Sequence, residues 1–284
     1  MRRHWRHCTR TLLRRGAAPL VLLNWRFPRA ALEHLWARAA YPRVCADGAA
    51  NRLRRGNEER KASSSSSSSA PRVELIPDAV YGDLDSLDSR TIPELRAKGV
   101  QVERNPCQDT NDLQKCVEMI CRGENDDGGN KAADHRVDVD VDASHADYAA
   151  TADLTHIIVA GALGGRLDHE MGNLNVAMQW CNRRSLVLLG AHSMALVLPT
   201  GVHEIIPDLR LETSTCGLIP LGNTCQSVTT TGLEYDLAEH TLEFGDLVSS
   251  SNAVRAGCTR VTVETSHPLL WTTSLSWEHY LAQH

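Results

Sequence analysis

Short apolar runs alternate with segments of helical spacing over the first two thirds of the chain. Apolar runs of this length are typical of strands buried on both faces of a parallel sheet, and they predict strands at 20–24, 43–46, 79–81, 100–102, 157–160 and 186–189. The clearest helix follows Thr110 and Asn111, either of which can cap it, and its apolar residues recur at positions 113, 116, 117, 120 and 121. Helices are also predicted at 30–40, 91–98 and 168–180.

The pattern changes after Ala191, where strand-like runs follow one another without helices. They lie at 195–198, 217–221, 227–231, 241–244, 260–264 and 269–273, separated by turns such as Pro199–Gly201. Such spacing is typical of an antiparallel β-sandwich. The sequence therefore predicts an α/β fold: a Rossmann-like, mostly parallel sheet with helices on both faces over 19–191, then a C-terminal antiparallel β-sandwich domain over 192–284.

Three segments fall outside this pattern. Residues 1–18 form a basic N-terminal extension whose arginines precede any acidic residue, which is typical of a mitochondrial presequence or a disordered basic tail. Residues 57–71, with a run of serines, and the polar, acidic residues 123–152 predict two disordered insertions. The aspartates at 138, 140 and 142 alternate as in a calcium loop, but the glycine and the glutamate that such a loop requires are missing.

Composition narrows the class of protein. The chain has 284 residues, 42% of them hydrophobic, which is enough for a sizeable core. A formal net charge of −5 argues against nucleic-acid binding, and nine cysteines without a CxxC pair indicate reduced thiols. No apolar run approaches the roughly 20 residues of a membrane span. We expect a cytoplasmic protein, with the mitochondrion as the alternative because of the arginine-rich start.

Acidic turns follow several predicted strands. Asp47 ends the run at 43–46, Asp83 and Asp85 follow 79–81, and Asp168 follows the glycines after 157–160, while Asp112 begins a helix. Ligands of parallel sheets bind beyond the carboxyl ends of the strands, so these side chains are expected to converge. Because Mg²⁺ binds through one or two carboxylates plus phosphate oxygens, the pattern predicts phosphoryl-type chemistry on a nucleotide.

A set of motifs in a fixed order carries a resemblance to a known family. They are Cys45–Asn51 (CADGAAN), Gly82–Ser86 (GDLDS), Gln108–Lys115 (QDTNDLQK), Gly164–His169 (GGRLDH), Cys216–Gly222 (CGLIPLG), Thr229–Leu233 (TTTGL), Ser249–Asn252 (SSSN) and Pro268–Thr272 (PLLWT). With these motifs the chain resembles thiamine pyrophosphokinases over most of its length. Only the two insertions and the N-terminus lie outside the resemblance.

The resemblance implies a reaction and an assembly. The terminal diphosphate of ATP, the co-substrate, would move to the hydroxyethyl group of thiamine with Mg²⁺ as cofactor, giving thiamine diphosphate and AMP. A homodimer is implied as well, with thiamine bound where one subunit's nucleotide domain meets the partner's β domain. Neither a nucleic acid nor a membrane is an expected partner.

The expected catalytic residues are Asp83, Asp85, Asp112, Lys115 and Arg166. The three aspartates are the expected Mg²⁺ ligands, because Asp83 and Asp85 share one tight turn. Lys115 and Arg166 neutralise phosphate charge. Asp85 or Asp112 accepts the hydroxyl proton. The alternatives are a turn with solvated aspartates and, for Arg166, a surface ion pair.

Further residues are expected to bind the two substrates. The ATP side comprises Asp47, Gln108, Gly164, Gly165, Asp168 and Asn175. The two glycines let backbone N–H groups approach phosphate, whereas Asp47 and Asp168 are equally consistent with helix N-caps. Ser249 and Asn252 reach thiamine from the partner subunit, unless they form an ordinary strand-end turn.

Some residues depart from the family's usual pattern, and rival functions remain. Leu84, Leu113 and Tyr235 replace larger aromatic residues, Ala49 replaces a glycine and Asn111 a threonine, while all acidic positions are kept. A dinucleotide-dependent Rossmann enzyme is one rival, but residues 161–165 do not fit GxGxxG. The others are a non-catalytic thiamine sensor, which needs no Mg²⁺ site, and a kinase that transfers only the γ-phosphate and releases ADP.

Overall fold

A parallel sheet forms the first part of the computed structural model, which describes residues 3–12, 14–62, 74–126 and 156–283. Its strands run in the order β7-β6-β2-β3-β4-β5. They are β2 (Pro19–Leu22), β3 (Ala40–Ala46), β4 (Ala79–Gly82), β5 (Gln101–Arg104), β6 (His156–Ala160) and β7 (Ser185–Leu189). Each predicted parallel strand is confirmed to within a few residues, because runs such as Leu186–Leu189 are buried on both faces.

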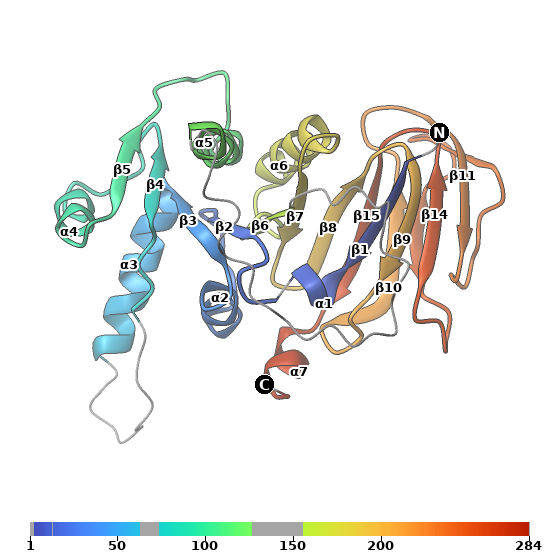
Figure 1. The fold of residues 1–284 in the computed structure, drawn as a ribbon, viewed down its shortest axis with the longest axis horizontal. Coiled ribbons are helices and arrows are strands. Elements are labelled where there is room, and N and C mark those ends of the chain that lie inside the picture. The colour runs from blue at the N-terminus through green and yellow to red at the C-terminus, as the bar shows by residue number, and fades with distance from the viewer. Residues whose placement is uncertain (1–2, 13, 63–73, 127–155, 284) are drawn as a thin grey trace.

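Helices cover both faces of this sheet (Figure 1). They are α2 (Arg29–Trp36), α3 (Asp47–Ala62), α4 (Thr91–Ala97), α5 (Asp112–Asp126) and α6 (Leu167–Trp180). The predicted cap of α5 is confirmed, since the Asn111 side chain accepts a hydrogen bond of 2.9 Å from the backbone N–H of Gln114. The buried residues of these helices and strands form one apolar core.

The second part is a β-sandwich. One of its sheets has the order β1-β9-β14-β11-β12 and the other contains β13-β10-β15-β8. The strands are β1 (His4–Cys8), β8 (Ser193–Leu198), β9 (Gly201–Ile206), β10 (Glu212–Ile219), β11 (Cys225–Thr231), β12 (His240–Leu242), β13 (Ser249–Ala253), β14 (Val261–Thr265) and β15 (Leu269–Leu275). Side chains alternate between buried and half-exposed along β9 and β14, and a second core with Trp271 fills the space between the sheets.

The two parts share one sheet across the predicted boundary at 191/192. β7 and β8 form an antiparallel pair, so the parallel strands and four sandwich strands make a continuous ten-stranded sheet. The chain then returns to the first part at its end: α7 (Trp277–Leu281) places Tyr280 against His34 of α2. The last residues of the predicted sandwich domain therefore pack on the α/β layer.

The N-terminal extension contains a strand, which corrects the picture of a disordered tail. β1 runs parallel to β9 at the sheet edge and is followed by α1 (Thr9–Leu12). Trp5 and His7 are buried in this pairing. His7 Nε2 lies 3.0 Å from His203 Nδ1, and His203 Nε2 lies 2.6 Å from the carbonyl oxygen of Pro199.

The two predicted insertions begin inside helices. α3 extends to Ala62 and α5 to Asp126, so 57–62 and 123–126 are helical instead of disordered. Charged pairs such as Arg54–Glu58, four residues apart, support the polar end of α3. The remainder of both insertions, 63–71 and 127–152, including the aspartates that resemble a calcium loop, lies outside the described residues.

Two whole-chain expectations can be compared with the structure. The cysteines of the described residues are not joined in disulfides. No helix in the described part of the chain has the length and apolar character needed to cross a membrane.

Candidate active site

A cavity of about 400 Å³ opens at the carboxyl ends of the parallel strands. It brings together most of the predicted residues from distant parts of the sequence: Asp47, Asp83, Gln108, Asp112, Lys115, Gly165, Arg166 and Asp168. The lining residues also include Asn24, Trp25, Thr110, His169 and Asn173, which sequence reasoning missed. No residue beyond Asn173 in the described part of the chain lines it, so the sandwich of the same subunit makes no contribution.

The turn after β4 places Asp83 in the lining of this cavity and holds Asp85 next to it, outside the lining. Asp83 Oδ1 accepts a hydrogen bond of 3.2 Å from the backbone N–H of Asp85, which closes the turn. Leu84 between them has a φ of 63°, a conformation that is costly for a residue with a branched side chain. A strained backbone of this kind persists only where the surrounding contacts hold it. The conformation of Leu84 turns the chain so that the carboxylates of Asp83 and Asp85 come close to each other.

Asp47, the first residue of α3, joins this pair. Its Oδ1 accepts from the Gly48 N–H at 2.6 Å and its Oδ2 accepts from the Ser86 N–H at 3.3 Å, so it bridges α3 to the turn. Burial raises the pKa of Asp47 above its usual value, against those two hydrogen bonds. Asp47, Asp83 and Asp85 each offer a carboxylate oxygen within 4.8 Å of the others.

Asn51 of α3 secures the far side of the same turn. Its amide donates to the Ser86 carbonyl at 2.6 Å and accepts from the Asp88 N–H and the Thr91 hydroxyl, both at 3.0 Å. The motif CADGAAN therefore supplies a carboxylate and an amide, four residues apart on one helix, that hold the aspartate turn. The spacing of these two polar residues in the sequence was the available signal for this role.

Asp112 stands apart from the acidic trio, although it was expected among the metal ligands. It lines the cavity from the first turn of α5. Burial, and then the negative charge of Asp47, raise the pKa of Asp112 to about 6. The set of carboxylates that meet is thus Asp47, Asp83 and Asp85, with Asp112 as a neighbour.

Lys115 brings a buried positive charge to the cavity. Its side chain is only 2% exposed, and its Nζ lies 3.4 Å from Asp83 Oδ2. Partial burial raises the pKa of Asp83, but hydrogen bonding with Asp85 and the positive charge of Lys115 outweigh it, so the net pKa lies below the usual value. Asp83 is therefore ionised when the cavity receives a ligand.

A glycine-rich loop between β6 and α6 forms the opposite rim. Gly164 has a φ of +91°, and a Cβ on Gly165 would come within 2.8 Å of the Trp25 indole. A side chain at Gly165 would therefore require Trp25 or the loop to shift. Such a loop, leading into a helix N-terminus, presents backbone N–H groups to an anion.

Arg166 and Asp168 pair with each other on this rim. The guanidinium donates two hydrogen bonds, of 3.1 Å and 2.6 Å, to the carboxylate, and both side chains are about two-thirds exposed. This is the surface ion pair that the sequence left open for Arg166. Both residues of the pair line the cavity.

Of the remaining residues predicted to bind ATP, Gln108 lines the cavity and Asn175 does not. Gln108 is exposed at the cavity. Asn175 is exposed on α6 and absent from the lining, whereas Asn173 lines the cavity and donates to the Ala162 carbonyl at 2.9 Å. The buried hydroxyl oxygen of Thr110 has no hydrogen-bond partner among the described residues, which leaves one polar group free for a ligand.

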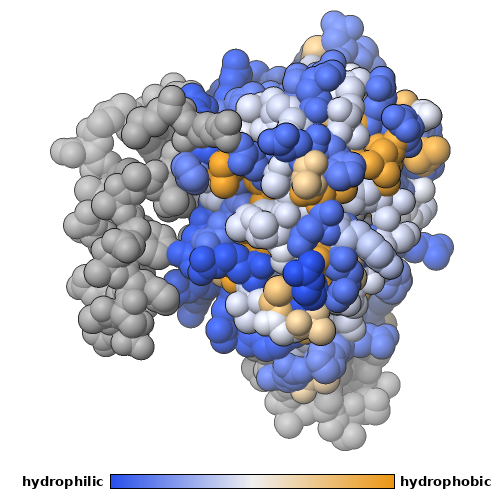
Figure 2. Space-filling model, turned by 90° about the vertical axis from the view of Figure 1, so that its right-hand side faces the viewer, coloured by the Kyte–Doolittle hydropathy of each residue, from blue (hydrophilic) through white to orange (hydrophobic). Residues whose placement is uncertain are grey.

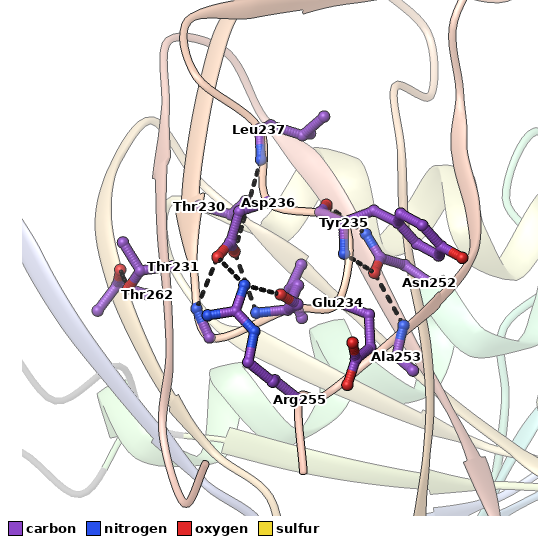
Figure 3. Close-up of polar contacts among 12 residues, drawn as sticks. Thr230, Thr231, Glu234, Tyr235, Asp236, Leu237, Asn252, Ala253, Arg255 and Thr262 are labelled. Atoms are coloured by element: carbon purple, nitrogen blue, oxygen red, sulfur yellow. Dashed lines mark hydrogen bonds and ion pairs between the residues drawn. The ribbon is translucent and has the colours of Figure 1, made fainter. Parts of the chain in front are cut away.

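Ser249 and Asn252 lie on β13, at the end of the ten-stranded sheet remote from β5. The Asn252 amide is occupied within the subunit: it accepts from the Tyr235 N–H at 3.2 Å and donates to the Tyr235 carbonyl at 2.9 Å (Figure 3). It also donates to Ser249 Oγ at 3.1 Å. Tyr235, in contrast, is 72% exposed. Asn252 therefore holds the backbone that presents Tyr235.

A second group of contacts fixes the same loop. The Asp236 carboxylate accepts from the Thr230 hydroxyl at 3.1 Å, from the Leu233 N–H at 3.0 Å and from Arg255 at 2.8 Å (Figure 3). The loop is thus anchored on both sides of Tyr235, and an exposed aromatic ring on a rigid backbone is suited to binding.

A parallel sheet with clustered carboxylates at its carboxyl edge, continued by a β-sandwich, defines an α/β protein with a site of the kind that binds metal and phosphate. Known proteins identify it further. The family models for the catalytic domain and the vitamin B1 binding domain of thiamin pyrophosphokinase match residues 32–189 and 202–270. The chain belongs to the thiamine pyrophosphokinase family.

Relatives and solved structures agree with this assignment. The chain is 37% identical over 261 residues to thiamine pyrophosphokinase 1 of Oryza sativa subsp. japonica, covering 92% of this chain and 88% of the relative. It is 39% identical over 263 residues to thiamine pyrophosphokinase 3 of the same plant, with the same coverage. The crystal structure of yeast thiamin pyrophosphokinase matches with a TM-score of 0.76 and 20% identity over 98% of this chain and 93% of that one, which shows the fold.

Proposed function

We propose that this protein is an ATP:thiamine diphosphotransferase, which transfers the terminal diphosphate of ATP to the hydroxyl of thiamine and releases AMP. One observation carries the proposal: Asp47 and Asp83 line one cavity with Lys115 and Arg166, and Asp85 offers a third carboxylate oxygen within 4.8 Å of both, in a chain of the thiamine pyrophosphokinase family. A carboxylate trio flanked by two cations matches a metal-bound polyphosphate.

The acidic trio fits Mg²⁺. Its three oxygens lie within 4.8 Å of one another, and hard carboxylate oxygens are the donors that Mg²⁺ prefers. We assign Asp47, Asp83 and Asp85 as the residues that would hold the ion, with Asp47 in place of Asp112. When bound, the ion would neutralise charge on the phosphate oxygens.

Side chains and backbone N–H groups of the cavity would bind the transferred diphosphate, and a carboxylate would accept the proton of thiamine. Lys115 is buried and stays fixed by Asp83, so its charge requires no reorganisation during the reaction. Arg166 leaves Asp168 for phosphate, and the N–H groups around Gly165 bind phosphate oxygens. Because Asp112 lines the cavity outside the trio, we assign it, in preference to Asp85, to accept the proton of the thiamine hydroxyl.

Thiamine is proposed to bind between two subunits. No sandwich residue of the described chain lines the cavity, yet Tyr235 is exposed on the sandwich and Asn252 holds its backbone in place. Leu167 and Met171 beside the cavity, and Tyr235, Phe244 and Leu247 on the sandwich, are exposed apolar residues that a homodimer would cover. The sandwich end in Figure 2 has separate apolar patches among polar residues.

The dimer has a direct test. Sedimentation equilibrium should give a mass of about twice the 31.3 kDa of the monomer. The double variant Tyr235→Glu, Leu167→Glu should lower this mass toward that of the monomer. Mixing Asp83→Asn protein with Tyr235→Ala protein should restore activity, because mixed dimers contain one site with both residues intact. No recovery in mixed dimers would contradict a shared site.

The reaction is tested by its products. Purified protein with thiamine, ATP and Mg²⁺ should form thiamine diphosphate and AMP in equal amounts, and Asp83→Asn should abolish both. ADP with thiamine monophosphate would instead indicate transfer of the γ-phosphate alone. Thiamine binding without any product would indicate a sensor.

We propose a cytoplasmic location. Removal of a presequence up to residue 18 would delete β1, which buries Trp5 and His7 against β9, and this favours retention of the N-terminus. A C-terminal fluorescent fusion, with N-terminal sequencing of the purified protein, tests the location. Mitochondrial fluorescence with a shortened N-terminus would contradict it.

A further inference from the structure

A second cavity opens beside the candidate active site, and residues of α2 and α3 line it. These two helices belong to the first part of the molecule (Figure 1). The volume of the second cavity is about 680 Å³, and it shares Asn24 and Trp25 with the active-site cavity. The loop after β2 forms one end, and successive turns of α3 form one wall. A ligand in this groove would therefore lie next to the active-site cavity.

Among the residues that the structure describes, five arginines line the groove, and two of them, Arg29 and Arg60, already form ion pairs with Glu33. Arg29 donates to Glu33 at 2.9 Å and to Asn57 at 2.8 Å. Arg60 lies 2.7 Å from the same Glu33. These two side chains join α2 to α3 and form the structural part of the groove.

The other three arginines, Arg26, Arg52 and Arg55, differ from these two in their charged neighbours. None of them has a carboxylate within ion-pair distance among the described residues; Arg52 contacts only the Asn24 amide oxygen, at 3.3 Å and 3.4 Å. Glu59 is the acidic residue of the described lining, and it pairs with none of the three. Burial, and then the positive charges of Arg26 and Arg55, lower the pKa of Arg52. An anion would relieve this mutual repulsion.

The floor of the groove is apolar and partly aromatic. Trp25, Phe27, Leu32 and Leu53 contribute to it. Guanidinium groups match phosphate oxygens in pairs and also stack on flat rings, while an apolar floor favours the ring of a ligand. Cationic rim and apolar floor together suit a phosphorylated compound with a flat ring, which is the chemistry of a nucleotide.

We propose that Arg26, Arg52 and Arg55 form a second phosphate-binding site, next to the catalytic cavity, for a ligand of the nucleotide class. Two ligands could supply the phosphate group that binds there. ATP extending from the catalytic cavity is one, and this source rests on the proposed function. A separate phosphorylated compound is the other, and its binding does not require turnover.

Binding of inorganic phosphate, measured by isothermal titration calorimetry, tests the site independently of catalysis. Arg52→Gln and Arg55→Gln should each weaken phosphate binding about tenfold, as expected for loss of a charge-assisted contact. Arg96→Gln is the matched control, because Arg96 is exposed on α4 and lines neither cavity. Thermal unfolding checks that each variant folds. Equal phosphate affinity in all four proteins would overturn the proposal.

Steady-state kinetics then separates the two sources. If ATP reaches the groove, Arg55→Gln raises KM for ATP several-fold and changes kcat little. If the ligand is separate, KM for ATP is unchanged without phosphate, and added phosphate alters the rate of the wild type but not of Arg55→Gln. An inactive wild type would refute the diphosphotransferase while leaving the calorimetric result to decide the groove.

Discussion

Nζ of Lys115 lies 3.4 Å from Oδ2 of Asp83, although the lysine side chain is only 2% exposed. The ammonium is held on a core-facing position of α5, next to Cys116 and Val117, which are fully buried. The structure thus keeps a charge in a costly place, with Asp83 as its partner. A buried cation at a phosphate-binding cavity is preorganised for the charge that develops during transfer.

Loss of this charge is expected to slow the reaction strongly. Lys115→Met should lower kcat by about 10²–10³-fold, the usual effect of removing one preorganised donor. Lys98→Met is the control, because that lysine pairs with Glu74 on the surface. Steady-state kinetics with a thermal melt separates catalysis from folding, and a Lys115→Met enzyme with near-normal kcat would exclude a catalytic role.

The acidic trio predicts a specific dependence on magnesium. Asp85→Asn should raise the Mg²⁺ concentration for half-maximal activity about tenfold or more, because one of three anionic oxygens loses its charge. Asp85 is exposed, so the fold should persist. Asp246→Asn, an exposed change in the sandwich, should leave the magnesium titration unchanged. The same Mg²⁺ requirement in both variants would remove Asp85 from the metal set.

The close approach of Gly165 to Trp25 predicts coupled substitutions. Gly165→Ala places a Cβ 2.8 Å from the indole, so the phosphate loop must shift, and kcat/KM for ATP should fall about tenfold. Trp25→Leu makes room, and the double variant should recover part of the loss, with a coupling energy of about 1 kcal/mol. Strictly additive effects would show that Trp25 and the loop act independently.

The hydrogen bonds around Tyr235 predict a role for Asn252 in positioning. Asn252→Ala should raise KM for thiamine by roughly the same factor as Tyr235→Ala, with smaller effects on kcat, because both changes remove the same presented ring. The double variant should be no worse than the poorer single variant. Ser250→Ala, at a neighbouring exposed position, serves as the control. An additional loss in the double variant would indicate that the Asn252 amide meets thiamine itself.

The two buried histidines predict loss of stability in mild acid. The Pro199 carbonyl can only accept, so His203 donates from Nε2 and accepts at Nδ1 from His7 Nε2, and both rings are neutral. Burial, and then the charges of His203 and His156, lower the pKa of His7 to about 3. Burial lowers the pKa of His203 to about 4. Unfolded histidine has a pKa of about 6.5.

Since both folded pKa values are depressed, the stabilisation is present above pH 6.5 and is lost as the pH falls toward 4. Urea unfolding should give a free energy about 1–2 kcal/mol lower per histidine at pH 5 than at pH 7. His7→Phe should reduce this pH dependence, and His192→Phe, at a surface position, should not. An unchanged slope in His7→Phe would mean that other groups control acid stability.

The sequence predicts the strands and most helices of the first part well, because runs such as Ile157–Ala160 are buried completely and the α5 spacing admits only one face. It does not predict α3 (Asp47–Ala62). That helix is mostly polar, with its few buried side chains near its start, and the serine run that follows obscured its end. The tertiary contacts of Asn57 with Leu75, 18 residues later, extend the helix.

The candidate site likewise has features that the sequence predicts and features that it does not. The acidic turns carry enough local chemistry to locate the cavity, since strand ends meet at one edge. Which carboxylates meet depends on distances across elements, so Asp47 rather than Asp112 joins Asp83 and Asp85. The role of Asn252 depends on a loop 17 residues earlier in the chain, and no spacing rule reveals that pairing.

The pairing of β1 with β9 sets an order in which the chain can be completed during synthesis. His7 and His203 are 196 residues apart, and β14, which flanks β9 on its other side, ends at Thr265. The first strand therefore cannot pair until β9 has been synthesised, and β9 is not flanked on both sides until β14 has followed, whereas the parallel sheet needs no strand beyond β7. Until then Trp5 and His7, which are buried in the folded chain, have no strand to cover them.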